Sequence, residues 1–139
     1  MDAAIKDALD RGGIVDMTTT GARSGEPRRI EIYLHQFDGR YYLAGRPGRR
    51  RDWLANLNAH PHFILHLKRG LQADVPAVAA EVTDRRERER LLFRARSESW
   101  GASEEEAQKN LDFWVRTSPL VMLEPTGLGD AHRPEADLQ

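Results

Sequence analysis

The chain contains no cysteine, which excludes disulfides, thiolate nucleophiles and cysteine-based zinc sites. It has no apolar run approaching the roughly 20 residues that a membrane-spanning helix needs. Residues 1–11 are charged throughout and contain no apolar core of a signal peptide. No internal repeat occurs in the sequence either. These absences predict a cytoplasmic protein without an integral membrane segment.

The length and the apolar content favour a single globular domain. The chain has 139 residues, of which 40% are hydrophobic, which suffices for a modest core and argues against global disorder. We expect this domain to span residues 1–125. Residues 126–139 are polar and contain glycine and proline, and we expect them to form a disordered tail.

The most distinctive stretch, residues 18–29, combines two glycines, a proline, hydroxyl side chains and three arginines between two strand-like runs. Glycine permits tight turns, whose backbone N–H groups can form a concavity for an anion. Arginine adds forked cationic donors that match phosphate and carboxylate groups. We interpret the stretch as an anion-binding loop at the mouth of a β-structure. A polar hairpin loop with solvated arginines is the alternative.

A second stretch rich in glycine and arginine, residues 46–52, follows another strand-like run. Residues 23–51 contain eight arginines against three acidic residues, a local balance of +5 in a chain whose net charge is −1. If strands bring the two loops together, they form one strongly positive pocket. This charge asymmetry predicts an anionic partner for the first half of the chain.

Hydrophobic periodicity predicts a small barrel of about six antiparallel strands. The expected strands are 13–20, 29–37, 41–45, 62–68, 71–82 and 119–124, and the expected helices are 2–9, 52–59, 84–99 and one that begins at residue 103. The second strand alternates strictly, so that Ile30, Ile32 and Leu34 should face the core. Its other face, with Glu31, Tyr33 and His35, should meet solvent or a ligand cleft. Asp38-Gly39 is a hairpin signal, and antiparallel hairpins favour closure into a barrel.

Local signals give five further expectations. Asp52 should cap the N-terminus of its helix. Pro76 should mark an edge strand or a bulge. The Arg/Glu-dense start of helix 84–99 should be a solvated face. Ser103 and Glu106 should form the capping box of a single helix. That helix should present an apolar stripe of Ala107, Leu111 and Trp114.

Several motifs follow one another along residues 13–125. Their residues are Thr19, Gly21, Ser24, Gly25 and Arg28, then Gly48, then Trp53, Asn56, Leu57 and Pro61, and in the last strand Thr117, Pro119, Val121, Glu124 and Pro125. In this combination the chain resembles the deazaflavin-dependent nitroreductase and quinone reductase family, whose members carry T-x-G-R-x-S-G-x-x-R, a glycine-containing loop and W-x-x-N-L-x-x-x-P.

The resemblance implies a split β-barrel that binds coenzyme F420, with FMN as the alternative cofactor. The reaction would be hydride transfer from the reduced deazaflavin to a small electron-poor acceptor such as a quinone, a nitro compound or an activated alkene. The residues that would hold the phosphate and the oligoglutamate tail are Arg23, Ser24, Gly25 and Arg28. Those along the deazaflavin would be Ala44, Gly45, Arg46, Pro47 and Gly48, with Asp52, Trp53 and Asn56 closing the far side.

Tyr33, on the predicted cleft face, is the candidate proton donor or substrate contact. A surface tyrosine on a half-exposed strand is the alternative interpretation. The chain departs from the family pattern at Ala22, where an arginine is usual, at Glu31, where a proline is usual, and at Pro47, where a basic residue is frequent. The tyrosines that line the substrate pocket in some members are absent from residues 94–101, where Trp100 is the only aromatic residue.

Three other kinds of function are compatible with parts of the sequence. His62 and His66 lie roughly 13 Å apart on one strand, too far to share a metal ion. An approach of His35 to His62 would permit heme binding. The arginine loops with Tyr41, Tyr42 and Trp53 could instead bind RNA or single-stranded DNA, although a net charge of −1 opposes this. A non-catalytic carrier of a flavin, heme or lipid is a further alternative, and a homodimer is left open.

Overall fold

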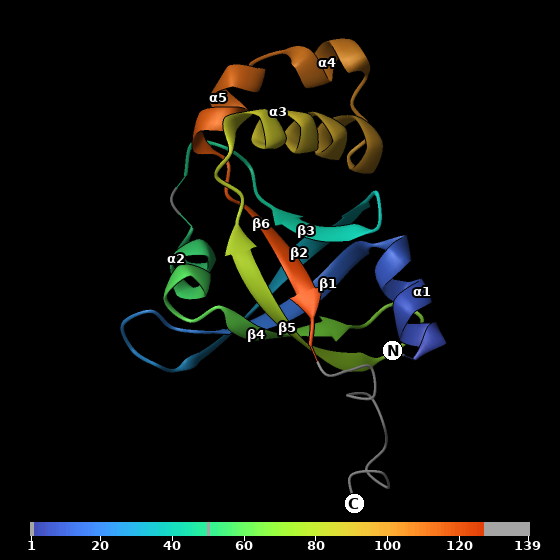
Figure 1. Cartoon of the computed structure of the whole chain (residues 1–139), viewed down its shortest axis with the longest axis vertical. Helices are drawn as coiled ribbons and strands as arrows, with labels where there is room; N and C mark the ends of the chain where they lie inside the picture. The colour runs from blue at the N-terminus through green and yellow to red at the C-terminus, as the bar shows by residue number, and fades with distance from the viewer. Residues whose placement is uncertain (1, 50, 127–139) are drawn as a thin grey trace, which may run out of the picture.

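Residues 2–49 and 51–126 are described by this computed structural model. Six strands close into a barrel in the order β1-β2-β3-β6-β5-β4, and every neighbouring pair is antiparallel. The strands are β1 (Gly13–Thr20), β2 (Pro27–Phe37), β3 (Arg40–Ala44), β4 (His62–Leu67), β5 (Ala73–Glu81) and β6 (Leu120–Pro125). Figure 1 shows the barrel below a layer of helices. The predicted barrel of six antiparallel strands is therefore confirmed.

Alternating apolar residues fill the barrel because every second side chain of a strand points inward. Ile32 and Leu34 of β2 are buried there together with Phe63 and Leu65 of β4, as the alternation predicts. Asp38 (φ +56°) and Gly39 (φ +82°) both adopt left-handed backbone conformations between β2 and β3. Two such residues make the tight turn of a two-residue hairpin, which brings β3 back beside β2.

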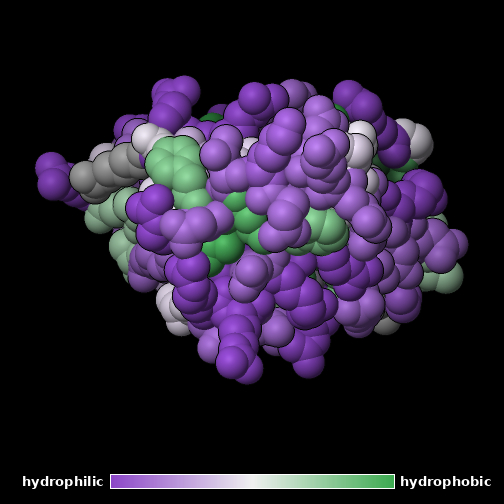
Figure 2. Space-filling view, turned by 90° about the horizontal axis from the view of Figure 1, so that it is seen from above, coloured by the Kyte–Doolittle hydropathy of each residue, from purple (hydrophilic) through white to green (hydrophobic). Residues whose placement is uncertain are grey.

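The helices lie in two places. Helices α1 (Ala3–Arg11) and α2 (Asp52–Ala59) pack against the barrel and contribute Ile5, Leu9 and Leu57 to its core. Three α-helices and one π-helical turn form the layer above: α3 (Arg85–Arg94), η1 (Ala95–Ser99), α4 (Glu104–Gln108) and α5 (Leu111–Thr117). This helical layer buries a second apolar cluster against the outer face of β3 and β6, including Tyr42 and Leu120. Seen from above, its surface is mostly hydrophilic around a narrow hydrophobic strip (Figure 2).

Two predicted helices are interrupted in the structure. The helix expected over 84–99 begins at its Asp84 cap, but at Ala95 it widens into η1, where the Trp100 N–H donates to the Ala95 carbonyl at 3.0 Å. The helix expected from residue 103 has the predicted capping box but breaks into α4 and α5 at Asn110 (φ +56°). Periodicity alone does not reveal such breaks, because the apolar stripe continues across them.

Two local predictions are wrong. The N-cap of α2 is Arg51, and Asp52 is the first helical residue. Pro76 does not mark an edge, because β5 pairs with both β4 and β6. The proline lies where the pairing with β6 ends, and its carbonyl accepts the Thr126 N–H at 2.8 Å. The start of α3 is exposed to solvent as predicted, except at Arg88, which is buried.

The rest of the predicted tail, residues 127–139, lies outside the described residues. Among the described residues, the helices are all too short or too polar to span a membrane.

Candidate functional site

Two pockets lie on either side of Trp53, which lines both. The first has a volume of about 620 Å³ and is lined by Thr19, Gly21, Ala22, Arg23, Ser24, Arg28, Ile30, Asp52, Trp53, Ala55 and Asn56. The second has a volume of about 650 Å³ and is lined by Ile14, Glu31, Ile32, Tyr33, Ala44, Gly45, Arg46, Arg51, Trp53, Arg96, Trp100, Ala102 and Trp114. The two arginine-containing loops therefore contribute to adjacent pockets that meet at one tryptophan.

The loop between β1 and β2 closes on itself. The Gly21 N–H donates to the Glu26 carbonyl at 2.8 Å, and the Gly25 N–H donates to the Gly21 carbonyl at 3.0 Å. Ser24 Oγ accepts the Glu26 N–H at 3.1 Å, and a Cβ atom at Gly21 would collide with that same oxygen. Gly25 adopts φ +71°, which favours glycine. The glycines and Ser24 thus define the shape of this loop.

Asn56 fastens this loop to α2. Its Oδ1 accepts the Ala22 N–H at 2.8 Å, and its Nδ2 donates to Thr19 Oγ1 at 3.1 Å. Because the side chain is buried, these two hydrogen bonds hold the loop in one position over the first pocket.

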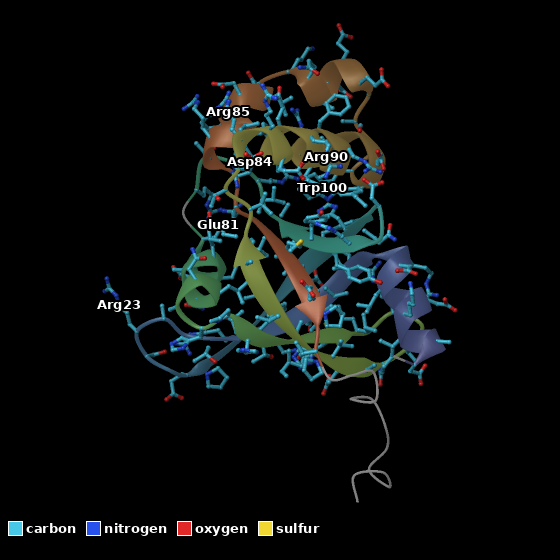
Figure 3. All side chains as sticks on the ribbon, in the orientation of Figure 1. Arg23, Glu81, Asp84, Arg85, Arg90 and Trp100 are labelled. Carbon is cyan, nitrogen blue, oxygen red and sulfur yellow. The ribbon has the colours of Figure 1, made fainter. Side chains whose placement is uncertain are left out.

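The positive charge of the first pocket comes from side chains. The N–H groups of Gly21, Ala22, Gly25 and Glu26 already donate within the protein. Arg23 and Arg28 line the pocket and are exposed, and Arg23 extends away from the barrel into solvent (Figure 3). Their guanidinium groups are therefore the cationic donors that this loop presents to the pocket.

One wall of the second pocket is formed by the end of β3 and the loop after it. The Gly45 N–H donates to the Pro119 carbonyl at 3.1 Å, and a Cβ atom at Gly45 would lie 2.8 Å from Pro119 Cγ. Arg51 Nη2 donates to the Arg46 carbonyl at 3.2 Å. Glycine thus lets this backbone lie close to β6, and both arginines line the pocket.

Aromatic side chains form the opposite wall. The Trp100 ring lies 6.1 Å from the Tyr33 ring and 6.1 Å from the Trp114 ring, centroid to centroid. The Tyr33 hydroxyl donates to the Ser99 carbonyl at 3.4 Å. Figure 3 shows Trp100 between the helical layer and the barrel. The π-helical turn before Trp100 brings this residue over β2. Such turns occur frequently at functional sites.

His35 lies behind this wall and is fully buried. Its Nδ1 pairs with Ser99 Oγ at 2.8 Å, and its Nε2 has no hydrogen-bond partner among the described residues. Burial lowers the pKa of His35 from 6.5 to about 4, because desolvation disfavours the charged imidazolium. His35 is therefore neutral at physiological pH.

Comparison with known proteins now decides the family. The family model for F420H2-dependent quinone reductases matches residues 2–127. The chain belongs to this family. It is therefore an oxidoreductase whose cofactor is coenzyme F420. No curated protein matches the chain.

Solved structures share the fold at low sequence identity. The conserved hypothetical protein Rv2991 from Mycobacterium tuberculosis has a TM-score of 0.69 and 18% identity, over 91% of this chain and 81% of that one. An F420H2-dependent reductase, FDR-A, has a TM-score of 0.51 and 24% identity, over 80% and 93% of the two chains. A chain described as a domain-swapped dimer has a TM-score of 0.57 and 23% identity, over 87% and 94%.

Most residues that the family resemblance indicated line the two pockets. Arg23, Ser24, Arg28, Asp52, Trp53 and Asn56 line the first, and Tyr33, Ala44, Gly45, Arg46 and Trp53 line the second. Gly25, Pro47 and Gly48 line neither pocket. The Gly48 N–H donates instead to Thr117 Oγ1 at 2.9 Å, which ties this loop to α5. The roles of all these residues in binding stay predictions.

Sequence reasoning missed the part of the second pocket that comes from the helical layer. Arg96, Trp100 and Trp114 were given no role there, although they lie within 20 residues of one another. Their proximity in sequence does not place them in a pocket, because only the fold shows that η1 and α5 face β2.

The heme geometry considered above does not occur. His35 lies on β2 and His62 on β4, and β1 pairs between these two strands. His66 is engaged by Thr18 Oγ1 and by the Asp74 carboxylate, each at 2.7 Å. Among the described residues, no group of three metal-ligating side chains is close enough to hold a metal ion.

Proposed function

We propose that the protein transfers a hydride from F420H2 to a small planar electron-poor acceptor, such as a quinone, a nitro compound or an activated alkene. The observation that carries this proposal is the pair of pockets joined at Trp53: the first carries the exposed Arg23 and Arg28, and the second carries four aromatic rings together with three arginines. The first suits a phosphate and carboxylate tail, whereas the second suits stacked planar rings.

The residues present fit the cofactor. The first pocket offers the guanidinium groups of Arg23 and Arg28 to a phosphate and carboxylate tail, and Ala44 and Gly45 line the second pocket beside four aromatic rings. We assign the phosphate and tail to Arg23, Ser24, Gly25 and Arg28, the ring system to residues 44–48, and the closure of the site to Asp52, Trp53 and Asn56. When bound, the cofactor supplies the hydride; the chain binds and orients the reactants.

The second pocket supplies the remaining elements of the reaction. Trp53, Trp100 and Trp114 line this pocket, and we propose that a planar acceptor packs against their rings. Tyr33 lines the same pocket, and we propose that its hydroxyl holds or delivers the proton that accompanies reduction of the acceptor.

Titration with F420 tests the proposal first. Fluorescence quenching should report F420 binding, and Arg28→Ala should weaken it at least about tenfold, because a charge-assisted contact is lost. Arg29→Ala is the matched control: this arginine is adjacent in sequence but pairs with Asp16 at 3.1 Å, so F420 affinity should change little.

Parallel titrations separate the alternatives. Binding of FMN in place of F420 would leave the fold assignment intact and remove the proposed mechanism. Salt-sensitive binding of an oligonucleotide would favour a nucleic-acid module instead. If the protein binds F420H2 tightly but quinones, enones and nitro compounds do not oxidise the bound F420H2, a carrier function would be favoured.

A further inference from the structure

Arg96 is the cation of the second pocket that belongs to the helical layer. Its Nη1 donates to the Ala107 carbonyl at 2.8 Å and to the Lys109 carbonyl at 2.6 Å. Its guanidinium lies over the Trp114 ring, 4.5 Å from the centroid. These contacts fix the plane of the guanidinium group, so the side chain is oriented before any ligand arrives.

The other edge of this guanidinium group has no partner among the residues that the structure describes. Nε and Nη2 carry the N–H groups that form a bidentate contact with a carboxylate, and neither makes a hydrogen bond to those residues. No carboxylate of the described chain lies within salt-bridge distance of Arg96. Partial burial lowers the pKa of Arg96 by desolvation, and the Coulombic attraction of Glu106 offsets only part of that shift.

The charges around the pocket leave this cation uncompensated. Arg46, Arg51 and Arg96 line it together with one carboxylate, Glu31. That carboxylate is already paired with Lys68 at 2.6 Å. Arg51 Nη2 donates to the backbone carbonyl of Arg46, and neither guanidinium group of that loop pairs with a carboxylate among the described residues. Arg96 differs from both because two carbonyls and the Trp114 ring fix its orientation on the wall that also carries Trp100. A ligand in this pocket therefore meets aromatic rings and three cations, of which Arg96 is the one held in place by the helical layer.

We infer that the acceptor is an aromatic anion whose acidic substituent binds the Nε–Nη2 edge of Arg96 while its ring lies against the aromatic side chains that line the pocket. This inference rests on the proposed function, because it concerns the acceptor in the second pocket. It makes Arg96 a residue that determines specificity: the substrate class is a planar electron-poor ring carrying a carboxylate, sulfonate or similar group.

Direct binding tests this without the cofactor. The probes are 1,4-naphthoquinone-2-sulfonate and 2-methyl-1,4-naphthoquinone, and quenching of tryptophan fluorescence measures their binding to the full chain. The absence of cysteine removes the thiols that would otherwise react with quinones. Arg96→Gln should weaken binding of the sulfonate at least about tenfold and leave binding of the methyl compound within about twofold.

Arg94→Gln is the matched control. Arg94 belongs to the same helical run and also covers an aromatic ring, that of Phe37 at 4.7 Å, but it pairs with Glu98 and Asp38 and does not line the pocket. Neither probe should change its affinity in this variant. If Arg96→Gln does not fold, Arg96→Lys serves as the test, since it keeps the charge and loses the forked edge, and it should weaken sulfonate binding selectively.

The inference would be overturned if Arg96→Gln lost affinity for both probes equally, or if it kept the wild-type affinity for the sulfonate. It would also be overturned if Arg96→Gln weakened F420 binding and left sulfonate binding unchanged, because Arg96 would then face the cofactor. Wild-type protein that binds the sulfonate through Arg96 but does not bind F420 would contradict the proposed function alone. In steady-state assays with F420H2, Arg96→Gln should lower kcat/KM for the sulfonate and preserve it for the methyl compound.

Discussion

At the scale of single residues, the position of a side chain in the fold determines whether it is accessible to a ligand. Tyr33 and His35 lie two residues apart on the same face of β2, yet Tyr33 lines a pocket and His35 is fully buried. The alternation of β2 predicted their shared face from sequence. It could not predict that His35 would be covered while Tyr33 stays accessible from the pocket. That difference depends on the contacts of Ser99 with β2, which form only in the folded chain.

The burial of His35 predicts a specific pH dependence of stability. Its folded-state pKa of about 4 lies below the unfolded value of 6.5, so the neutral form is favoured in the folded state and stability decreases as the pH falls through that window. The loss should reach about 2 kcal/mol at pH 5. Urea denaturation of wild type and His35→Phe between pH 7 and pH 5 measures it.

In His35→Phe, the free energy of unfolding should change less with pH between pH 7 and pH 5 than in the wild type. Carboxylates such as Asp16, whose pKa is lowered by Lys68, lose their contribution at lower pH, so the upper part of the window reports on His35. Parallel profiles for the two proteins would show that burial of this histidine does not determine the acid sensitivity.

At the scale of secondary-structure elements, one buried arginine connects the helical layer to the barrel. Arg88 of α3 donates to three carbonyls: Nε to Val115 at 2.8 Å, Nη1 to Val82 at 2.9 Å and Nη2 to Ser118 at 2.5 Å. These acceptors lie after β5 and around the end of α5. The sequence indicated only a charged, solvated helix start, since it cannot distinguish Arg88 from its exposed neighbours.

We therefore expect Arg88→Met to lower the free energy of unfolding by about 3 kcal/mol, because three carbonyls lose charge-assisted hydrogen bonds while the apolar stem is kept. Arg86→Met, an exposed position on the same helix, should stay within about 0.5 kcal/mol of wild type. Urea denaturation followed by circular dichroism measures both. A cost at Arg88 no larger than at Arg86 would contradict the role of this side chain as a connection.

At the scale of the whole molecule, the site lies where two structural layers meet. The first pocket is built from the β1–β2 loop and α2, and the second adds η1 and α5. Ordered motifs predicted the barrel and the first pocket well, because turns, caps and strand alternation are local signals. The far wall of the second pocket depends on how the helical layer packs on β2 and β3, and no local signal encodes that contact.

Because the two pockets are built from different elements, a substitution that loosens the contact between the β1–β2 loop and α2 should weaken cofactor binding and leave acceptor binding unchanged. Asn56→Ala removes the hydrogen bonds to Ala22 and Thr19, so the loop loses its fixed position and Arg28 its orientation. We expect F420 affinity to fall about tenfold and stability by about 2 kcal/mol, while tryptophan quenching by the sulfonated quinone stays close to wild type. Asn58→Ala, an exposed position on the same helix whose partner is Glu81, should change neither affinity. Because Asn56 contacts only the first pocket, equal losses of cofactor and quinone binding would mean that the two pockets behave as one unit, with Trp53 transmitting the change between them.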